Sequence, residues 1–288
     1  MDEKEFRALI SLLDDDDEDV VRHVEDKILS IGDHIIPQLE QEWEGDYSPQ
    51  VQRRIEDLIH TLQYHLHRQR MIKWFADGGD DLLEGLWIIA TYQYPNLQLA
   101  DVRREIEQIY YQAWIDFKKD LHPFDQVKLL NNVLFNKIKF RPNASAKDFH
   151  APSNSMINMV LESRKGNPIS LCSIYLLVAR KLEMPVYGVN LPNLFICTYK
   201  SPALQFYINA FNNGIIFSRS DIENYIQQLN VQPRDIFFEP CSHTDLVKRV
   251  LRNLVIAFEK NGEHHKSDEV KQVLKAVSPG EDDEPNLS

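Results

Sequence analysis

The sequence contains few cysteines, few glycines and no long hydrophobic run. Of its 288 residues, only 3 are Cys and 10 are Gly. Cys172, Cys197 and Cys241 show no CxxC spacing, which argues against a structural zinc site or a disulfide framework and fits a reducing compartment. No uncharged apolar run reaches the roughly 18 residues of a membrane span, and the acidic start MDEKEF lacks the apolar core of a signal peptide. We therefore expect a soluble, cytoplasmic protein without a membrane partner.

Positive charge is scarce at the start of the chain. Asp and Glu number 44 against 32 Lys and Arg, a net charge of −12. Residues 1–60 hold 18 acidic and 6 basic residues, whereas residues 61–288 hold 26 of each. This balance argues against nucleic-acid binding, which needs a basic contact face. The acidic run from Asp14 to Asp19 leaves two interpretations open, a solvated surface or a contact with a basic partner.

Common metal and nucleotide motifs are also missing. The sequence contains no HExxH, EF-hand loop, P-loop or GxGxxG motif. We therefore expect no metal site and no cofactor.

Hydrophobic periodicity predicts a largely helical N-terminal part. Apolar residues recur in steps of three and four between residues 6 and 64, with breaks at the acidic run, at Gly32 and at Ser48. Helices continue to about residue 140. After that point the sequence predicts loops, an apolar helix over 169–182 and three short strands over 186–191, 194–199 and 204–209. The predicted fold class is α+β, with C-terminal helices after the sheet.

Several long phrases resemble the SirB-type branch of the transglutaminase-like superfamily. They include LLNNVLFNKIKFRPN (129–143), APSNSMINMVLESRKGNPISL (151–171), YLLVARKLEMPVYGVNLP (175–192) and FYINAFNNGIIFSRSDI (206–222). VKRVLRNLVIAFEKNG (247–262) is similar to the C-terminal helical hairpin of that family. The resemblance implies a papain-like core with a small antiparallel sheet. The start of the chain resembles a HEAT-type repeat.

This resemblance divides the chain into five segments. We expect a HEAT-like helical segment at 1–66, a helical SirB-type region at 67–140 and the transglutaminase-like core at 141–240. C-terminal helices over 241–278 and a disordered tail over 279–288 would follow.

The resemblance also places the catalytic positions of the superfamily. Its catalytic members use a Cys at a helix N-terminus, a His on the next strand and an Asp or Asn on the strand after that. Matching phrases put Pro168, Leu194 and Asn209 at these positions. Proline cannot act as a nucleophile and leucine cannot act as a base. The resemblance therefore implies a core that has lost its catalytic residues, and no catalytic residue is expected.

Cys172 is the candidate for a replacement nucleophile. It lies six residues after Gly166, where the field of the helix N-terminus has faded, and no His occurs between residues 151 and 242. A buried structural thiol is the favoured interpretation. Candidate cleft-lining residues are Asn154, Asn167, Ser170, Asn190 and Asn193. Asn side chains commonly fix irregular loops, so a loop-forming role competes with ligand recognition.

The leading functional hypothesis is a catalytically inactive protein-binding, scaffolding or regulatory module. The partner would be a protein, whose identity and stoichiometry the sequence leaves open. The alternative is a thiol-dependent amidase or peptidase that uses Cys172. A third interpretation is a helical adaptor in which the former cleft is filled.

Overall fold

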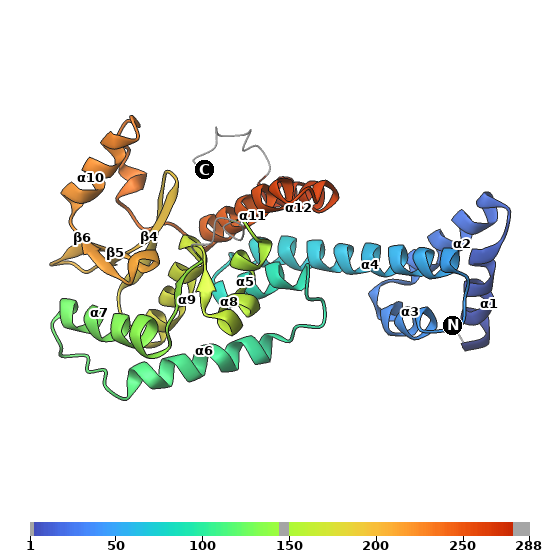
Figure 1. Cartoon of the computed structure of the whole chain (residues 1–288), viewed down its shortest axis with the longest axis horizontal. Coiled ribbons are helices and arrows are strands. Elements are labelled where there is room, and N and C mark those ends of the chain that lie inside the picture. Colours follow the sequence, from blue (N-terminus) through green and yellow to red (C-terminus); the bar gives the residue numbers. More distant parts are fainter. Residues whose placement is uncertain (1–2, 144–149, 279–288) are drawn as a thin grey trace. The chain divides into compact units, whose positions relative to one another are not determined.

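The computed structural model describes residues 3–143 and 150–278 and divides the chain into two compact units, Met1–Arg70 and Met71–Ser288 (Figure 1). The tail over 279–288, predicted to be disordered, lies outside the described residues. No helix among the described residues is long and apolar enough to cross a membrane.

The first unit is built from short helices. Asp17 caps the second of them by accepting a hydrogen bond from the backbone N–H of Asp19. Pro37 lies in the first turn of the third helix, where its missing N–H costs nothing. The elements are α1 (Glu3–Ser11), η1 (Leu12–Asp14), α2 (Glu18–Ile31), η2 (Asp33–Ile35), α3 (Ile36–Trp43) and α4 (Pro49–Ala76), which continues into the second unit.

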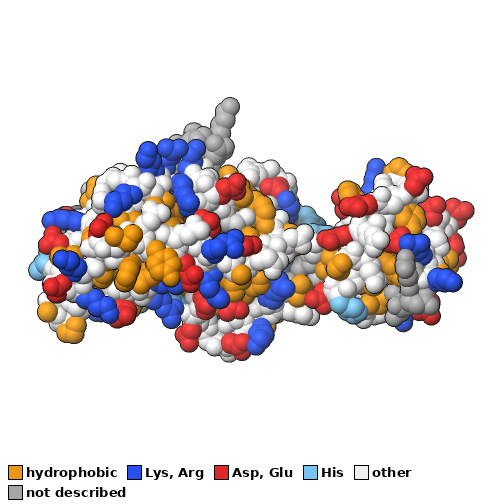
Figure 2. Space-filling view, turned by 90° about the horizontal axis from the view of Figure 1, so that it is seen from below, with side chains coloured by type: hydrophobic (Ala, Val, Ile, Leu, Met, Phe, Trp, Pro, Cys, Tyr) orange, Lys and Arg blue, Asp and Glu red, His pale blue; other side chains and the backbone are white. Residues whose placement is uncertain are grey.

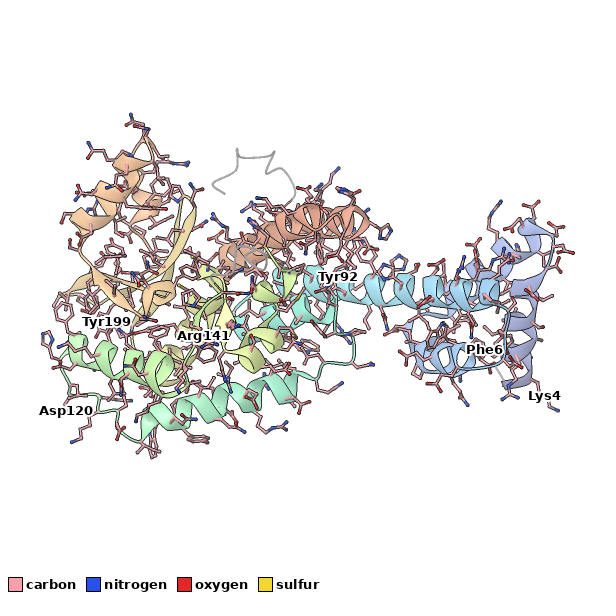
Figure 3. The ribbon with its side chains drawn as sticks, in the orientation of Figure 1. Lys4, Phe6, Tyr92, Asp120, Arg141 and Tyr199 are labelled. Carbon is pink, nitrogen blue, oxygen red and sulfur yellow. The ribbon has the colours of Figure 1, made fainter. Side chains whose placement is uncertain are left out.

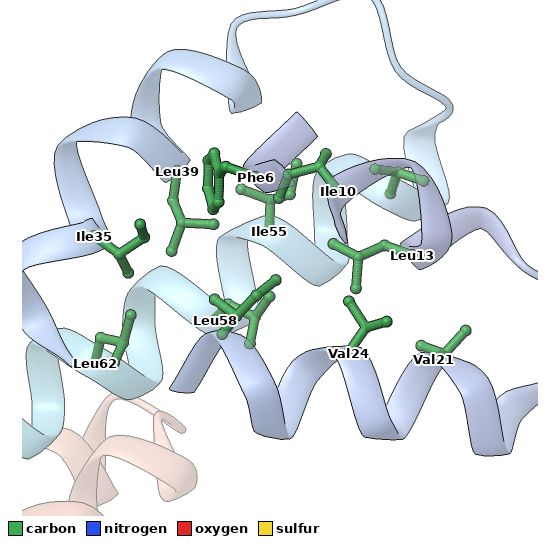
Figure 4. Close-up of a cluster of buried hydrophobic side chains, with 12 residues drawn as sticks. Phe6, Ile10, Leu13, Val21, Val24, Ile35, Leu39, Ile55, Leu58 and Leu62 are labelled. Carbon is green, nitrogen blue, oxygen red and sulfur yellow. The ribbon is translucent and has the colours of Figure 1, made fainter. Parts of the chain in front are cut away.

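One hydrophobic cluster holds the first unit together (Figure 4). Ile10, Leu39 and Ile55 come from α1, α3 and α4 and are fully buried within it. Val24 and Ile28 face the same cluster from α2. The periodic apolar residues of the sequence therefore form the core of this unit, which needs no residue beyond Leu62.

The second unit combines helices with a four-stranded sheet (Figure 1). Helix α9 is its central element, because eleven consecutive residues from Ile169 to Ala179 are buried. The helices are α5 (Leu82–Thr91), α6 (Leu99–Trp114), α7 (Pro123–Asn131), α8 (Ile157–Ser163), α9 (Pro168–Lys181), α10 (Arg219–Gln228), α11 (His243–Lys260) and α12 (His264–Val277). The short 3-10 helices are η4 (Pro152–Ser155), η5 (Ala210–Asn212) and η6 (Asp235–Phe237).

The sheet is an antiparallel meander. Its strands are β3 (Val186–Leu191), β4 (Leu194–Lys200), β5 (Gln205–Asn209) and β6 (Ile215–Phe217), in that order. Gly188 pairs with Cys197, and Asn190 pairs with Phe195, so these four residues lie on one face. Val189, Leu191 and Leu194 belong to the opposite face, where they pack with residues of α10 and η6. The α+β fold class is confirmed.

Aromatic rings join the sheet to α7. Tyr199, labelled in Figure 3, stacks on Phe206 across strands β4 and β5 at 5.1 Å between ring centroids. Phe206 in turn lies 4.5 Å from Phe124 in the first turn of α7. The stacked rings lie on the face of the sheet that also contacts α9, and they hold α7 against it.

Three features of the second unit stand out among those that sequence analysis did not predict. The first is β6, whose residues were not predicted as a strand. The second is a short parallel pair in which β1 (Arg141–Pro142) aligns with β2 (Lys165–Gly166). The third is η3 (Asn132–Lys137), a π-helical turn that continues α7. Short strands and a change of helical pitch leave little trace in hydrophobic periodicity.

Candidate functional site

The start of α9 is the place where the resemblance puts the nucleophile of the superfamily. Pro168 occupies the first helical position, and Asn167 is the N-cap. The Asn167 Oδ1 accepts a hydrogen bond from the backbone N–H of Ser170 at 2.9 Å, while its Nδ2 donates to the Ser155 Oγ at 2.9 Å. Asn167 therefore uses both ends of its amide to position the helix start, and Pro168 brings no reactive atom.

Polar residues around this helix start form a connected network. Asn154 is buried in η4, and its Oδ1 accepts a hydrogen bond from the Asn143 Nδ2 at 2.8 Å. Ser170 is also buried and donates its hydroxyl to the carbonyl of Asn167 at 3.1 Å. The predicted residues Asn154, Asn167 and Ser170 thus come together in two neighbouring elements. Their hydrogen bonds join η4 to Asn143 and to the start of α9.

Leu194 and Asn193 lie at the hairpin between β3 and β4. Asn193 adopts a left-handed backbone conformation with φ of 57°, which the turn requires, and its side chain is exposed. Leu194 packs with the hydrophobic cluster that includes Ile222 and Ile226 of α10. Leu194, which the resemblance matches to the base, is therefore a packing residue on the α10 face of the sheet.

Asn209 closes the turn after β5. Its Oδ1 accepts a hydrogen bond from the backbone N–H of Asn212 at 3.2 Å, and its carbonyl accepts one from Gly214 at 2.8 Å. Within the described residues, no hydrogen bond or ion pair links Pro168, Leu194 and Asn209 to one another. Each of the three positions has a local structural role instead.

Cys172 is completely buried. Its Sγ lies 3.3 Å from the carbonyl oxygen of Phe195, to which the thiol donates. Cys197, on the adjacent strand, has 0% exposure, and burial raises its pKa well above the ordinary value for a thiol. Burial likewise raises the pKa of Cys241 to about 12. A cysteine nucleophile needs a thiolate and an access path. The raised pKa values of Cys197 and Cys241 oppose the first, and complete burial of Cys172 and Cys197 opposes the second.

Asn190 makes the least expected contact of the predicted set. Its Oδ1 accepts a hydrogen bond from the Nη1 of Arg249 at 3.2 Å. Arg249 lies in α11 and is only 9% exposed, and burial together with the charge of Arg252 lowers its pKa. Sequence analysis missed Arg249. The available signal was its spacing, since Arg249 follows Leu246 by three residues and so flanks the apolar face of α11.

A pocket of about 600 Å³ lies elsewhere, between α10 and the loop that follows it. The Arg219 guanidinium lies 4.1 Å from the centre of the Phe238 ring on its wall and pairs with Glu223 at 3.1 Å. None of the residues predicted from the sequence lines this pocket.

Comparisons with known proteins identify the family of the region that contains α9. The family model described as transglutaminase-like superfamily matches residues 100–252, which is more than half of the chain. The chain belongs to the transglutaminase-like superfamily. In this superfamily member, the matched region extends from α6 into α11 and includes the whole sheet.

Relatives of the superfamily member come from bacteria and animals. A UPF0162 protein of Xylella fastidiosa is 27% identical over 180 residues, which are 60% of this chain and 63% of that protein. F-box only protein 21 of Homo sapiens is 27% identical over 203 residues, covering 58% of this chain and 32% of the human protein. The mouse F-box only protein 21 is 33% identical over 203 residues, which again cover 58% of this chain and 32% of that protein. The chain thus spans less than two thirds of the length of these relatives. No solved structure matches the chain.

Proposed function

We propose that this protein is a non-catalytic member of the transglutaminase-like superfamily that binds a protein partner as a scaffolding or regulatory module. The observation that carries the proposal is the start of α9, where Pro168 stands at the nucleophile position and Asn167 is engaged in helix capping. The nearest thiol along the helix, Cys172, is buried and donates to a backbone carbonyl. The same geometry argues against a thiol-dependent amidase or peptidase that uses Cys172.

An exposed hydrophobic patch supports the binding role. Tyr111, Trp114 and Ile115 lie at and just after the C-terminal end of α6 and are 57%, 57% and 74% exposed. Figure 2 views the molecule from the side on which α6 lies, and hydrophobic side chains gather there among charged ones. Large aromatic side chains on a surface are typical of sites where protein partners bind. This patch is our candidate contact surface.

The finer assignments also belong to the proposal. We place the chain in the SirB-type branch of the superfamily, with a HEAT-like helical segment at 1–66, a helical region at 67–140, the core at 141–240 and C-terminal helices at 241–278. The phrases NPISL at 167–171 and YLLVARKLEMPVYGVNLP at 175–192 support the branch. Helices α1 to α4, with their own core, support the HEAT-like segment.

The catalytic half of the proposal is tested by turnover. The full-length protein is incubated with peptide amides, and release of ammonia or cleaved peptide is measured beside a Cys172→Ser variant. We expect both proteins to match the buffer blank, because no accessible thiolate is available. Turnover by the wild-type chain that the variant loses would overturn this half.

The binding half is tested by site-specific photo-crosslinking in cells. A benzophenone amino acid replaces Ile115 in the patch or, as a control, Asn224, which is exposed on α10. We expect a discrete protein adduct from position 115 and none from position 224. Equal labelling from both positions, or none from position 115, would contradict a partner at this surface.

A further inference from the structure

Arg249 is a buried cation without a matching anion. Its side chain is nine-tenths buried in α11, next to the core residues Leu246 and Val250. Within residues 3–143 and 150–278, the hydrogen bond from its Nη1 to Asn190 is its polar contact, and no Asp or Glu forms an ion pair with it. Asn190 is a neutral amide, so the positive charge is not balanced.

The neighbours of Arg249 add positive charge rather than remove it. Arg252 lies close enough to lower the pKa of Arg249 by repulsion. Tyr225 of α10 is the other group that influences it, and the Tyr225 hydroxyl donates to the carbonyl of Pro192 at 2.9 Å. Arg249 therefore lies by the end of β3, near the hairpin between β3 and β4, and the charge of Arg252 opposes its own.

Such an arrangement is unfavourable unless an anion completes it. Removing a guanidinium from water is costly, and proteins normally offset that cost with a paired carboxylate and further hydrogen bonds. The guanidinium presents five N–H donors in a planar fork, and only one of its nitrogens is used by Asn190. The fork matches the two oxygens of a carboxylate.

We propose that Arg249, held by Asn190, is a receptor for a single carboxylate group of a peptide or protein partner. This inference rests on the proposed function, because it treats the chain as a binding protein and names the chemistry that its partner presents. A terminal carboxylate or an Asp or Glu side chain would supply the group. One buried guanidinium beside a neutral amide suits a singly charged carboxylate better than a phosphate, which usually recruits several cations.

The direct test follows the side-chain Nε–Hε signal of Arg249 by nitrogen-15 NMR of the full chain, assigned by its loss in Arg249→Lys. The probes are N-acetylglycine, N-acetylglycinamide and inorganic phosphate, each at constant ionic strength. We expect a saturable shift with N-acetylglycine and no saturable shift with the other two. Equal responses to the carboxylate and the amide, stronger binding of phosphate, or no response would each overturn the inference.

A second variant separates ligand binding from a structural role. Arg249→Met keeps the length of the side chain but removes the unbalanced charge. We expect its melting temperature without ligand to equal or exceed that of the wild type, and we expect N-acetylglycine to raise only the wild-type value. The control is Arg104→Met, which removes an exposed arginine paired with Asp101. It should change neither the melting temperature without ligand nor the rise caused by N-acetylglycine.

A structural arginine would give the opposite result, a clear fall in the melting temperature of Arg249→Met in the absence of ligand. That outcome would overturn the receptor role. The crosslinking and turnover tests do not depend on Arg249, so failure of this inference and failure of the proposed function can be told apart.

Discussion

Side chains at or beside the positions that the resemblance assigns to catalysis have local structural roles. Asn167 caps the helix, Leu194 fills a hydrophobic cluster and Asn209 closes a turn. Each role is local and structural. Pro168 and Leu194 carry no group that could act as nucleophile or base, which is the residue-scale support for the proposed non-catalytic role.

The Cys241 thiol provides a pH-dependent prediction at the residue scale. Burial raises its pKa from an ordinary 9.0 to about 12. Between these values, an unfolded chain has lost the thiol proton while the folded chain keeps it, so the free energy of unfolding must fall as the pH rises. The loss approaches about 1.4 kcal/mol for each pH unit within this window.

Urea unfolding of the wild type and of Cys241→Ala at pH 8, 9 and 10 measures this effect. Other groups also titrate in this range, so the quantity of interest is the difference between the two proteins. We expect the stability advantage of the wild type to shrink from pH 9 to pH 10. Parallel pH profiles for the two proteins would show that the thiol keeps an ordinary pKa.

The local roles of residues near α9 could be predicted from the sequence far better than their long-range contacts. The phrase GNPISL already indicates a capped helix with Pro168 in its first turn, because capping and proline preferences are local. The bond between Asn190 and Arg249 joins residues 59 positions apart. Only tertiary packing decides such a contact, so local patterns could not indicate that these two residues pair.

At the scale of elements, the π-helical turn η3 is tied to the sheet through Asn131. The Asn131 Nδ2 donates to the carbonyl of Gly214, in the turn between β5 and β6, at 2.8 Å. Gly214 has φ of 75°, and a Cβ built on it would lie 2.2 Å from the Asn131 Oδ1. The turn therefore needs glycine for two reasons: the positive φ of its backbone, and the close approach of the Asn131 side chain.

Gly214→Ala should lower the free energy of unfolding by about 2–4 kcal/mol, the combined cost of backbone strain and overpacking. Gly78→Ala is the matched control, since φ is 100° there but no atom lies within 4 Å of the added Cβ. Its cost should be limited to strain, about 1–2 kcal/mol. In denaturant titrations, adding Asn131→Ala to Gly214→Ala should recover part of the loss. Strictly additive effects would mean that the two side chains do not collide.

Element boundaries followed from the sequence where the signal was local and periodic. Strand β3 begins and ends where alternation and turn residues predict, and α9 differs from its prediction by one residue at each end. The π-helical turn was predicted as ordinary helix, because apolar residues recur through it without interruption. The pair β1 and β2 is only two residues long in each strand, too short for a period to register.

At the scale of the molecule, the boundary in charge and the boundary between the two hydrophobic cores fall at nearly the same place in the chain. The first 60 residues carry the whole excess of negative charge, and the first unit buries its hydrophobic side chains within residues 6 to 62. The second unit has its own core around α9. Units with separate cores can unfold separately, which gives a prediction for the whole chain.

Leu39 is fully buried in the core of the first unit, so Leu39→Ala should destabilise that unit by about 2–5 kcal/mol. Hydrogen exchange followed by mass spectrometry should then show faster exchange of the amides in α2 and α3, while those of α9 keep the wild-type rate. Gln38→Ala, which changes the exposed neighbour, should leave both regions unchanged. Faster exchange in α9 as well would mean that the chain unfolds as one cooperative body, because the loss of the first core would then reach the second.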